Sequence, residues 1–276
     1  MPHPEFPFGP ALLFCPADRP DRFAKAAERA DAVILDLEDA VAPEAKAAAR
    51  DALVRHPLDP ARVIVRVNPA GTADFAADLA ALAGTGYRTV MLAKCGCTAD
   101  LVDLVDFTVV ALCETAAGVL AAPDVAGLPN VSALMWGADD LVASLGGSSS
   151  RTATGAYRDV ARSARSSVLL AAGAAGIAAV DAVHLDIGDL EGLREEAEDA
   201  AAVGFRATAC IHPSQVQVVR EAYRPDAAEL ERARAVIAAA GRAGAGVFVH
   251  EGGMVDAPVV RHAESVLRRA GEHAGS

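Results

Sequence analysis

Short runs of apolar, often β-branched residues alternate along the chain with longer Ala-rich stretches whose apolar positions recur at helical spacing. The short runs lack polar alternation, which is typical of parallel strands that are buried on both faces. Eight runs are therefore predicted to be strands: Ala11–Phe14, Ala32–Leu37, Val63–Val67, Thr89–Ala93, Thr108–Cys113, Ser132–Trp136, Ala182–Ile187 and Thr208–Ile211. The predicted helices between them include Arg19–Arg29, Pro43–Val54, Thr72–Leu82, Tyr157–Ala175, Leu190–Val203 and Pro213–Tyr223. Eight β/α units over roughly 200 residues predict an α/β fold of the TIM (β/α)8 barrel type.

The pattern changes after the eighth unit. Residues Asp226–Gly241 predict one helix, a Gly-containing stretch runs to Gly253, and a last helix ends near Arg269. Because a closed barrel needs no further element, residues 225–276 are expected to form a C-terminal helical arm or lid. Residues 1–224 would then be the barrel domain, with the arm free to pack against a neighbouring subunit.

Composition narrows the class of protein. The 276 residues are 53% hydrophobic, enough for a large buried core, and the formal charge of −12 disfavours nucleic acid or an anionic membrane as a partner. No apolar stretch reaches the roughly 20 residues of a membrane span, and the first residues do not resemble a signal peptide, so a cytoplasmic protein is expected. Five scattered cysteines make a disulfide framework improbable, and Cys95–Gly96–Cys97 lacks a second Cys/His pair for zinc.

Polar residues at the ends of the predicted strands mark the candidate site, because TIM barrels place their chemistry at the carboxyl ends of the strands. These residues are Asp36, Glu38, Asp39, Arg66, Asn68, Lys94, Glu114, Asp139, Asp140, Asp186 and His212. Carboxylates dominate the set. Converging carboxylates repel one another, so such a cluster is stabilised by a bound cation or by arginines.

Glu114 and Asp140 follow consecutive predicted strands, whose spacing in a sheet is about 5 Å. Two carboxylates at that separation can ligate one ion, and hard oxygen ligands with room for water and substrate suit Mg²⁺. The alternative is that each is a helix N-cap, since helices follow at once. Glu is a poor N-cap residue, which favours the ligand interpretation for Glu114.

Arg66 interrupts an otherwise apolar run near the end of the third predicted strand. A guanidinium cannot lose its charge on burial, so Arg66 must face anions. One alternative is a structural ion pair with Glu38 or Asp39 of the adjacent strand. The other is a functional role, in which Arg66 holds a substrate oxygen and stabilises negative charge in the transition state.

Two further groups of residues allow a structural and a functional interpretation. Four basic residues at helical spacing form a stripe that either is solvated surface or binds a phosphate-rich ligand: Arg19, Arg22, Lys25 and Arg29. His184 and Asp186 lie two apart on the seventh predicted strand and so face one side. They form either a hydrogen-bonded structural pair or a catalytic dyad, with the structural pair favoured.

Seven segments occur together in a recognisable order. They are Leu13–Pro20 (LFCPADRP), Ile34–Ala40 (ILDLEDA), Val65–Asn68 (VRVN), Cys113–Ala116 (CETA), Trp136–Leu141 (WGADDL), Ile211–Gln215 (IHPSQ) and Gly253–Asp256 (GMVD). In this arrangement the chain resembles the citrate lyase β-subunit-like (CitE-like) proteins of the HpcH/HpaI aldolase superfamily, which includes malyl-CoA and citramalyl-CoA lyases. The resemblance covers nearly the whole chain.

The resemblance implies a Mg²⁺-dependent TIM-barrel lyase that breaks or forms a carbon–carbon bond in a 3-hydroxyacyl-CoA, yielding acetyl-CoA and a 2-oxo acid. Members are commonly trimers, so a homotrimer is expected. The resemblance implies the following roles: Glu114 and Asp140 as metal ligands, Arg66 at the reacting oxygens, Phe14, Arg19 and Lys25 as CoA contacts, Asp256 as an acid/base from an adjacent subunit, and Glu38 and Asp39 as supports of the metal's water shell and of Arg66.

The loop after the fourth predicted strand departs from the family pattern. It reads Leu92–Ala93–Lys94–Cys95–Gly96–Cys97, without the usual Pro before the lysine and without the acidic residue after it. Three alternatives to a free-standing acyl-CoA lyase stay open: a citryl-CoA lyase subunit of a multi-component citrate lyase, an aldolase that does not use CoA, and a non-catalytic CoA-binding protein.

Overall fold

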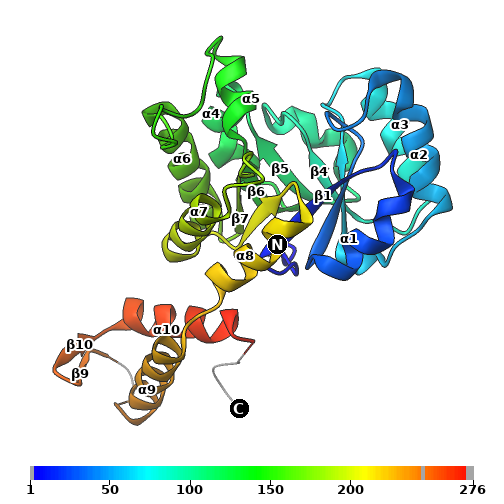
Figure 1. Ribbon diagram of the computed structural model, residues 1–276. Helices are drawn as coiled ribbons and strands as arrows, with labels where there is room; N and C mark the ends of the chain where they lie inside the picture. Colours follow the sequence, from blue (N-terminus) through cyan, green and yellow to red (C-terminus); the bar gives the residue numbers. More distant parts are fainter. Residues whose placement is uncertain (1–2, 244–245, 272–276) are drawn as a thin grey trace. The chain divides into compact units, whose positions relative to one another are not determined.

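The computed structural model describes residues 3–243 and 246–271 (Figure 1). Its first unit is a closed barrel of eight parallel strands in the order of the sequence, with β8 pairing back onto β1. The strands are β1 (Ala11–Pro16), β2 (Ala32–Asp36), β3 (Val63–Val67), β4 (Thr89–Leu92), β5 (Thr108–Cys113), β6 (Val131–Trp136), β7 (Ala178–Asp181) and β8 (Ala207–Cys210). The predicted TIM barrel is confirmed.

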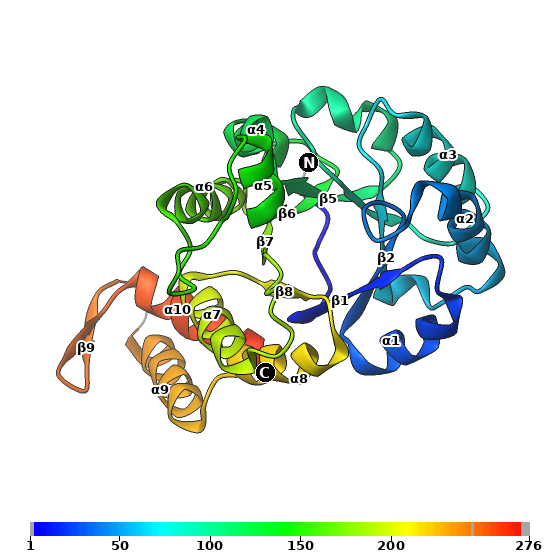
Figure 2. The same ribbon diagram turned by 45° about the horizontal axis from the view of Figure 1, so that its top comes forward.

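The α-helices of this unit surround the strands (Figure 2). They are α1 (Phe23–Arg29), α2 (Lys46–Arg55), α3 (Ala73–Leu82), α4 (Ala116–Ala126), α5 (Ala138–Ser144), α6 (Asp159–Ala175), α7 (Leu190–Val203) and α8 (Pro213–Tyr223). Short 3-10 turns add η1 (Pro20–Arg22), η2 (Pro43–Ala45), η3 (Pro60–Arg62) and η4 (Thr98–Leu104). Among the described residues, no helix combines the length and apolar character needed to cross a bilayer.

Alternate residues of the strands fill the barrel interior. One buried cluster collects inward side chains from the strands, including Leu12, Ile34, Ile64, Met91, Val110, Leu112, Met135, Val180 and Ala209. Because side chains alternate along a strand, the next inward position beyond this core lies two residues further on. For β2, β3 and β5 these positions are Asp36, Arg66 and Glu114. The core therefore fixes which polar side chains point into the barrel mouth.

The seventh strand differs from the prediction. The predicted run is Ala182–Ile187, but β7 is Ala178–Asp181, where Val180 pairs with Met135 of β6 and with Ala207 of β8. Ala178–Asp181 is short and Ala-rich, and follows α6 directly after Gly176, so its pattern does not separate it from the helix. The barrel hydrogen bonds decide the assignment. Leu185 and Ile187 of the predicted run are exposed.

The chain divides into two compact units, Met1–Val219 and Arg220–Ser276. The second contains α9 (Ala227–Ala243), a hairpin of β9 (Phe248–His250) and β10 (Gly253–Val255), and α10 (Ala257–Arg269). Helices α9 and α10 enclose a small apolar core of their own that includes Ala233, Ala263, Val266 and Leu267. Both helices were expected from the sequence, whereas the antiparallel hairpin was not.

Candidate active site at the carboxyl ends of the strands

Arg66 is held by carboxylates of the neighbouring unit. Its Nε and Nη2 donate to Asp36 Oδ1 and Oδ2 at 2.7 Å and 2.6 Å, and its Nη1 lies 3.1 Å from Glu38 Oε2. The guanidinium carbon also lies 4.8 Å from the ring centre of Phe14. Burial lowers the pKa of Arg66, but the hydrogen bonds and charge of Asp36 outweigh burial and raise it. The expected pair with Glu38 is therefore present, and Asp36 adds a bidentate partner that was not expected.

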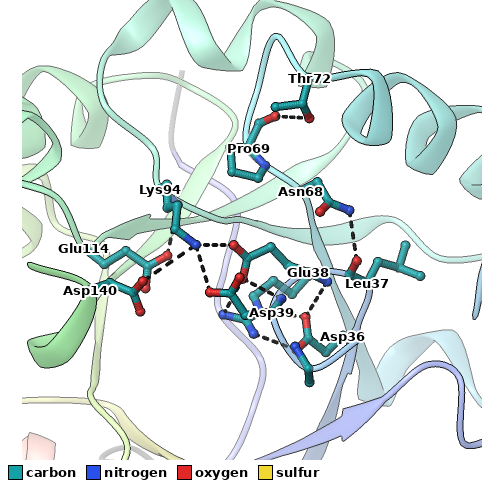
Figure 3. A network of polar contacts seen from close by, with 12 residues as sticks. Asp36, Leu37, Glu38, Asp39, Asn68, Pro69, Thr72, Lys94, Glu114 and Asp140 are labelled. Carbon is teal, nitrogen blue, oxygen red and sulfur yellow. Dashed lines mark hydrogen bonds and ion pairs between the residues drawn. The ribbon is translucent and has the colours of Figure 1, made fainter. Parts of the chain in front are cut away.

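The turn that carries Glu38 is fixed by a buried lysine. Lys46 Nζ donates to the carbonyl oxygens of Leu37 and Glu38 at 2.8 Å and 3.1 Å, and to Asn68 Oδ1 at 2.6 Å. Asn68 in turn donates from Nδ2 to the Leu37 carbonyl at 3.0 Å (Figure 3). The same Nδ2 donates to Asp78 Oδ2 at 2.7 Å. The three hydrogen bonds of Lys46 use all three N–H groups of its ammonium. The Leu37–Glu38 backbone is therefore rigidly placed beneath the site.

Glu114 is buried directly after β5. Burial and the nearby charge of Asp140 raise the pKa of its carboxyl group to about 8, despite the opposing charges of Arg66 and Lys94. Gly137 provides the space that Glu114 occupies: a Cβ at this position would lie 2.8 Å from Glu114 Oε2. The φ of Gly137 is −134°, which any residue adopts, so space rather than backbone conformation requires glycine here.

Asp140 lies in the first turn of α5, and its side chain is 40% exposed. The N-cap of α5 is Gly137, and the N-cap of α4 is Thr115, whose side chain accepts a hydrogen bond from Gly118 N. Neither Glu114 nor Asp140 is therefore an N-cap, and the structural alternative considered for both is wrong. Their carboxylates are left to act at the barrel mouth.

Lys94 connects the carboxylates of the site. Its backbone N–H donates to Glu114 Oε1 at 3.1 Å, and its Nζ pairs closely with Glu38 Oε1 and with Asp39 Oδ2 at 2.9 Å. The same ammonium lies 3.7 Å from Asp140 Oδ1, so it stands between the two carboxylate pairs (Figure 3). Lys94 has a φ of 51°, in the left-handed region that is costly for a non-glycine residue.

The charge pattern and donor atoms fit a hard divalent cation. Among the described residues, the cationic side chains that meet the carboxylates of Asp36, Glu38, Asp39, Glu114 and Asp140 are Arg66 and Lys94. The buried Glu114 carboxylate costs free energy to ionise beside Asp140, and a divalent ion between them would remove that cost. Across residues 3–243 and 246–271, no group of three or more His, Cys, Asp or Glu side chains is arranged to hold a metal. The pair would thus be a two-carboxylate site, which suits Mg²⁺.

The remaining predicted residues lie as follows. Phe14 lines the site beside Arg66, whereas Arg19 precedes the 3-10 turn η1, outside α1, and forms an exposed ion pair with Asp21 at 2.8 Å. The expected continuous helix from Arg19 to Arg29 is therefore wrong, since Pro20 opens a 3-10 turn first. Lys25 is exposed on α1. Asp256 belongs to the second unit and caps α10, accepting from Val259 N at 3.3 Å.

The predicted pairing of His184 with Asp186 is wrong. Both residues lie in the loop after β7, and His184 Nδ1 hydrogen-bonds to Glu196 Oε2 at 2.9 Å, while Nε2 lies 3.4 Å from Asp189 Oδ2. Asp186 accepts from Gly188 N instead. The side-by-side arrangement required a strand, and without one the two side chains have separate partners. His184 therefore connects the loop after β7 to Glu196 of α7, which is a structural role.

The sequence analysis assigned no specific role to two residues of the site, Asp36 and Lys94. Asp36 was recognised only as a polar strand end, yet it continues the inward phase of Ile34 and pairs in register with Arg66. Lys94 was recognised only as a residue after β4, and nothing in the sequence pattern indicates its left-handed backbone. The inward alternation of β2 is the signal that could have identified Asp36.

Known proteins are similar to this chain over most of its length. Residues 11–213 match the HpcH/HpaI aldolase/citrate lyase family model. The citrate lyase subunit beta-like protein of Mycobacterium tuberculosis is 61% identical over 264 residues, covering 96% of each chain. A (3S)-malyl-CoA thioesterase of Cereibacter sphaeroides is 35% identical over 286 residues, covering 98% of this chain and 97% of that protein.

Among solved structures, CitE from Mycobacterium tuberculosis in complex with magnesium, acetoacetate and coenzyme A superposes with a TM-score of 0.90. That chain is 61% identical to this one, and the match covers 96% of this chain and 99% of that chain. The expected resemblance, with magnesium and coenzyme A among the ligands of a relative, is confirmed.

Proposed function

The chain belongs to the HpcH/HpaI aldolase/citrate lyase family, and on that premise we propose that it is a magnesium-dependent carbon–carbon lyase. Its substrate class is a 3-hydroxyacyl-CoA such as citramalyl-CoA or malyl-CoA, which it cleaves to, or forms from, acetyl-CoA and a 2-oxo acid, pyruvate or glyoxylate. The observation that carries the proposal is that Glu114 and Asp140 both lie at Lys94, beside the guanidinium of Arg66 that Asp36 holds. The magnesium, acetoacetate and coenzyme A bound by the M. tuberculosis protein support the same ligand classes.

Each residue at the barrel mouth has a distinct task in the proposed reaction. Glu114 and Asp140 would hold Mg²⁺, which when bound supplies the Lewis acidity that lowers the pKa of the substrate hydroxyl. Arg66 is fixed by Asp36 and keeps further N–H groups to donate to the oxygen on which negative charge develops. Glu38 pairs with Arg66 and Asp39 with Lys94, and both carboxylates would support the water around the metal.

Cleavage moves two protons: one leaves the substrate hydroxyl and one is added to the enolate carbon. The hydroxyl gives its proton to solvent water, its carbon becomes the carbonyl of the 2-oxo acid, and the electron pair of the broken carbon–carbon bond becomes the enolate of acetyl-CoA. Asp256 would then protonate the enolate carbon, or remove that proton in the condensing direction. Phe14, Arg19 and Lys25 would contact the CoA portion, where two exposed cations suit its phosphates.

Asp256 would reach the reacting carbon of a neighbouring subunit in a homo-oligomer, which we propose to be a trimer. Its position in a separate C-terminal unit is consistent with such an exchange. Co-expression of Glu114→Gln with Asp256→Asn tests it: each variant alone should be inactive, while mixed oligomers should regain part of the activity. Mixed oligomers as inactive as either parent would refute the contribution across subunits.

The decisive experiment is a panel of CoA thioesters assayed for 2-oxo acid release with and without Mg²⁺. The proposal expects Mg²⁺-dependent release of pyruvate or glyoxylate together with acetyl-CoA, abolished by Glu114→Gln. Release of free CoA and an intact hydroxy acid would instead indicate a thioesterase, as the C. sphaeroides relative is named. CoA binding without Mg²⁺ dependence or product would indicate a non-catalytic CoA-binding protein.

Two other lyase assignments differ from the proposed one in how they use CoA. A citryl-CoA lyase subunit of a multi-component citrate lyase would need its thioester on a partner protein, so the isolated chain would not act on free CoA thioesters. The M. tuberculosis relative is named a citrate lyase subunit beta-like protein, and that name supports this alternative. An aldolase that does not use CoA would keep its activity when Arg19 and Lys25 are both replaced by Gln, whereas the proposed enzyme would lose CoA affinity.

A further inference from the structure

Lys94 stands between two pairs of carboxylates whose roles must differ. Glu38 and Asp39 come from the end of β2, while Glu114 and Asp140 come from β5 and α5. Its Nζ pairs directly with the first two, at close range and at 2.9 Å, and lies 3.7 Å from Asp140, beyond hydrogen-bond distance. The ammonium therefore engages one pair and stands next to the other.

The backbone of Lys94 contacts the second pair. Its N–H donates to Glu114 Oε1 at 3.1 Å, and the left-handed φ of 51° accompanies this arrangement. One residue thus fixes one oxygen of Glu114 by its main chain while its side chain holds Glu38 and Asp39. A strained backbone that is retained at such a point is typical of functional sites.

We infer that Lys94 is a positioning residue that keeps Glu38 and Asp39 out of the metal's ligand shell, so that only Glu114 and Asp140 bind the ion. This inference rests on the proposed function, because it concerns the metal of that same site. Carboxylates that accept hydrogen bonds from an ammonium are less available to a cation. The absence, within the described part of the chain, of any grouping of three or more ligating side chains agrees with this separation.

The separation has a consequence for selectivity. Mg²⁺ is bound through one or two carboxylates and keeps several waters, which substrate oxygens can replace, whereas Ca²⁺ accepts six to eight oxygens in a flexible geometry. A site that offered four carboxylates would bind more tightly but leave fewer positions for substrate. By withholding two of them, Lys94 would favour Mg²⁺ over Ca²⁺ and keep the ion accessible to the 2-oxo acid.

Lys94→Met tests the inference, because Met is an unbranched side chain only one atom shorter than Lys and imposes the same backbone strain while removing the charge. The purified full-length variant is titrated calorimetrically with Mg²⁺ and with Ca²⁺. We expect both dissociation constants to fall, that for Mg²⁺ by roughly tenfold or more, and that for Ca²⁺ by a larger factor. Lys94→Arg keeps the charge and should bind as the wild type does. If Lys94→Met does not fold, Lys94→Gly, which suits the left-handed backbone, replaces it.

Adding Glu38→Gln to Lys94→Met tests whether the released Glu38 carboxylate is the group that binds the metal. The double variant should lose the gain in affinity that Lys94→Met alone produces. Lys94→Met affinities equal to or weaker than wild type would overturn the inference while leaving the proposed function intact. Tighter binding that survives Glu38→Gln and Asp39→Asn would also overturn it, because Lys94 would then act only through its charge. A wild-type chain that binds no Mg²⁺ would overturn the proposed function and this inference with it.

Discussion

Replacing Asp36 with Asn should unlock Arg66 and destabilise the barrel. Asp36 is fully buried and accepts four hydrogen bonds: Oδ1 from Arg66 Nε and Glu38 N, and Oδ2 from Arg66 Nη2 and Ala40 N. Asn has one oxygen where Asp has two, so in either orientation one guanidinium N–H and one backbone N–H lose their acceptor. The negative charge opposite a buried guanidinium is lost as well.

The magnitude follows from those losses. A hydrogen bond to a charged group contributes about 1.5–3 kcal/mol, and an unsatisfied buried donor costs about 1–3 kcal/mol. Together they give a loss of about 2.5–6 kcal/mol in the free energy of unfolding, which spans the roughly 3–5 kcal/mol typical of breaking a buried ion pair. Because a reacting group displaced by about 1 Å can cost about 10²-fold in rate, kcat should fall by about that factor even where the variant stays folded.

Urea unfolding followed by the fluorescence of Trp136 measures the effect. Trp136 is the only tryptophan in the chain and is fully buried in β6, so it reports on the barrel unit alone. Asp51→Asn is the matched control, because Asp51 pairs with Arg55 on the surface of α2 and should leave the midpoint unchanged. A midpoint for Asp36→Asn as high as that of Asp51→Asn would refute the reasoning.

A double-mutant cycle strengthens this test. Asp36→Asn combined with Arg66→Met removes both charges, so the double variant should lose less stability than the sum of the single variants. Strict additivity would mean that the two side chains do not interact, contrary to their bidentate geometry.

Two further predictions concern Gly137 and His184. Gly137→Ala should displace Glu114 and weaken Mg²⁺ binding in calorimetry, whereas Gly173→Ala, in open space on α6, should stabilise the barrel by about 0.5–1 kcal/mol; equal metal affinity in both would refute the steric argument. The hydrogen bond to Glu196 raises the pKa of His184, so His184 stabilises the fold below about pH 6.5, and this contribution is lost as pH rises through the raised pKa. The stability difference between wild type and His184→Asn in Trp136 unfolding should therefore shrink with rising pH, and a difference independent of pH would contradict the assignment.

Much of the fold could be predicted because the barrel strands are buried on both faces. That burial leaves uninterrupted apolar runs, and the bounds of β3 and β5 agree with the prediction. β7 could not be predicted, because Ala178–Asp181 is composed of residues that suit a helix equally well, and only pairing with β6 and β8 makes it a strand. Local pattern decides an element only where tertiary hydrogen bonds do not override it.

Part of the candidate site could likewise be predicted from the sequence. Neighbouring strands place Glu114 and Asp140 together, so sequence order alone indicates their proximity. The partner of Arg66 was underdetermined, because Asp36, Glu38 and Asp39 all follow β2 and only the alternation of side chains selects Asp36 and Glu38. The position of the Lys94 ammonium depends on the left-handed backbone of that residue. The periodicity of the sequence does not reveal such a conformation.

Crystals soaked with Mn²⁺ as an anomalous stand-in for Mg²⁺, together with pyruvate, test the central claim most directly. The account predicts one anomalous peak bound by carboxylate oxygens of both Glu114 and Asp140 at about 2.0–2.3 Å, with pyruvate on the same ion beside Arg66. A peak elsewhere, or none between these two side chains, would contradict it.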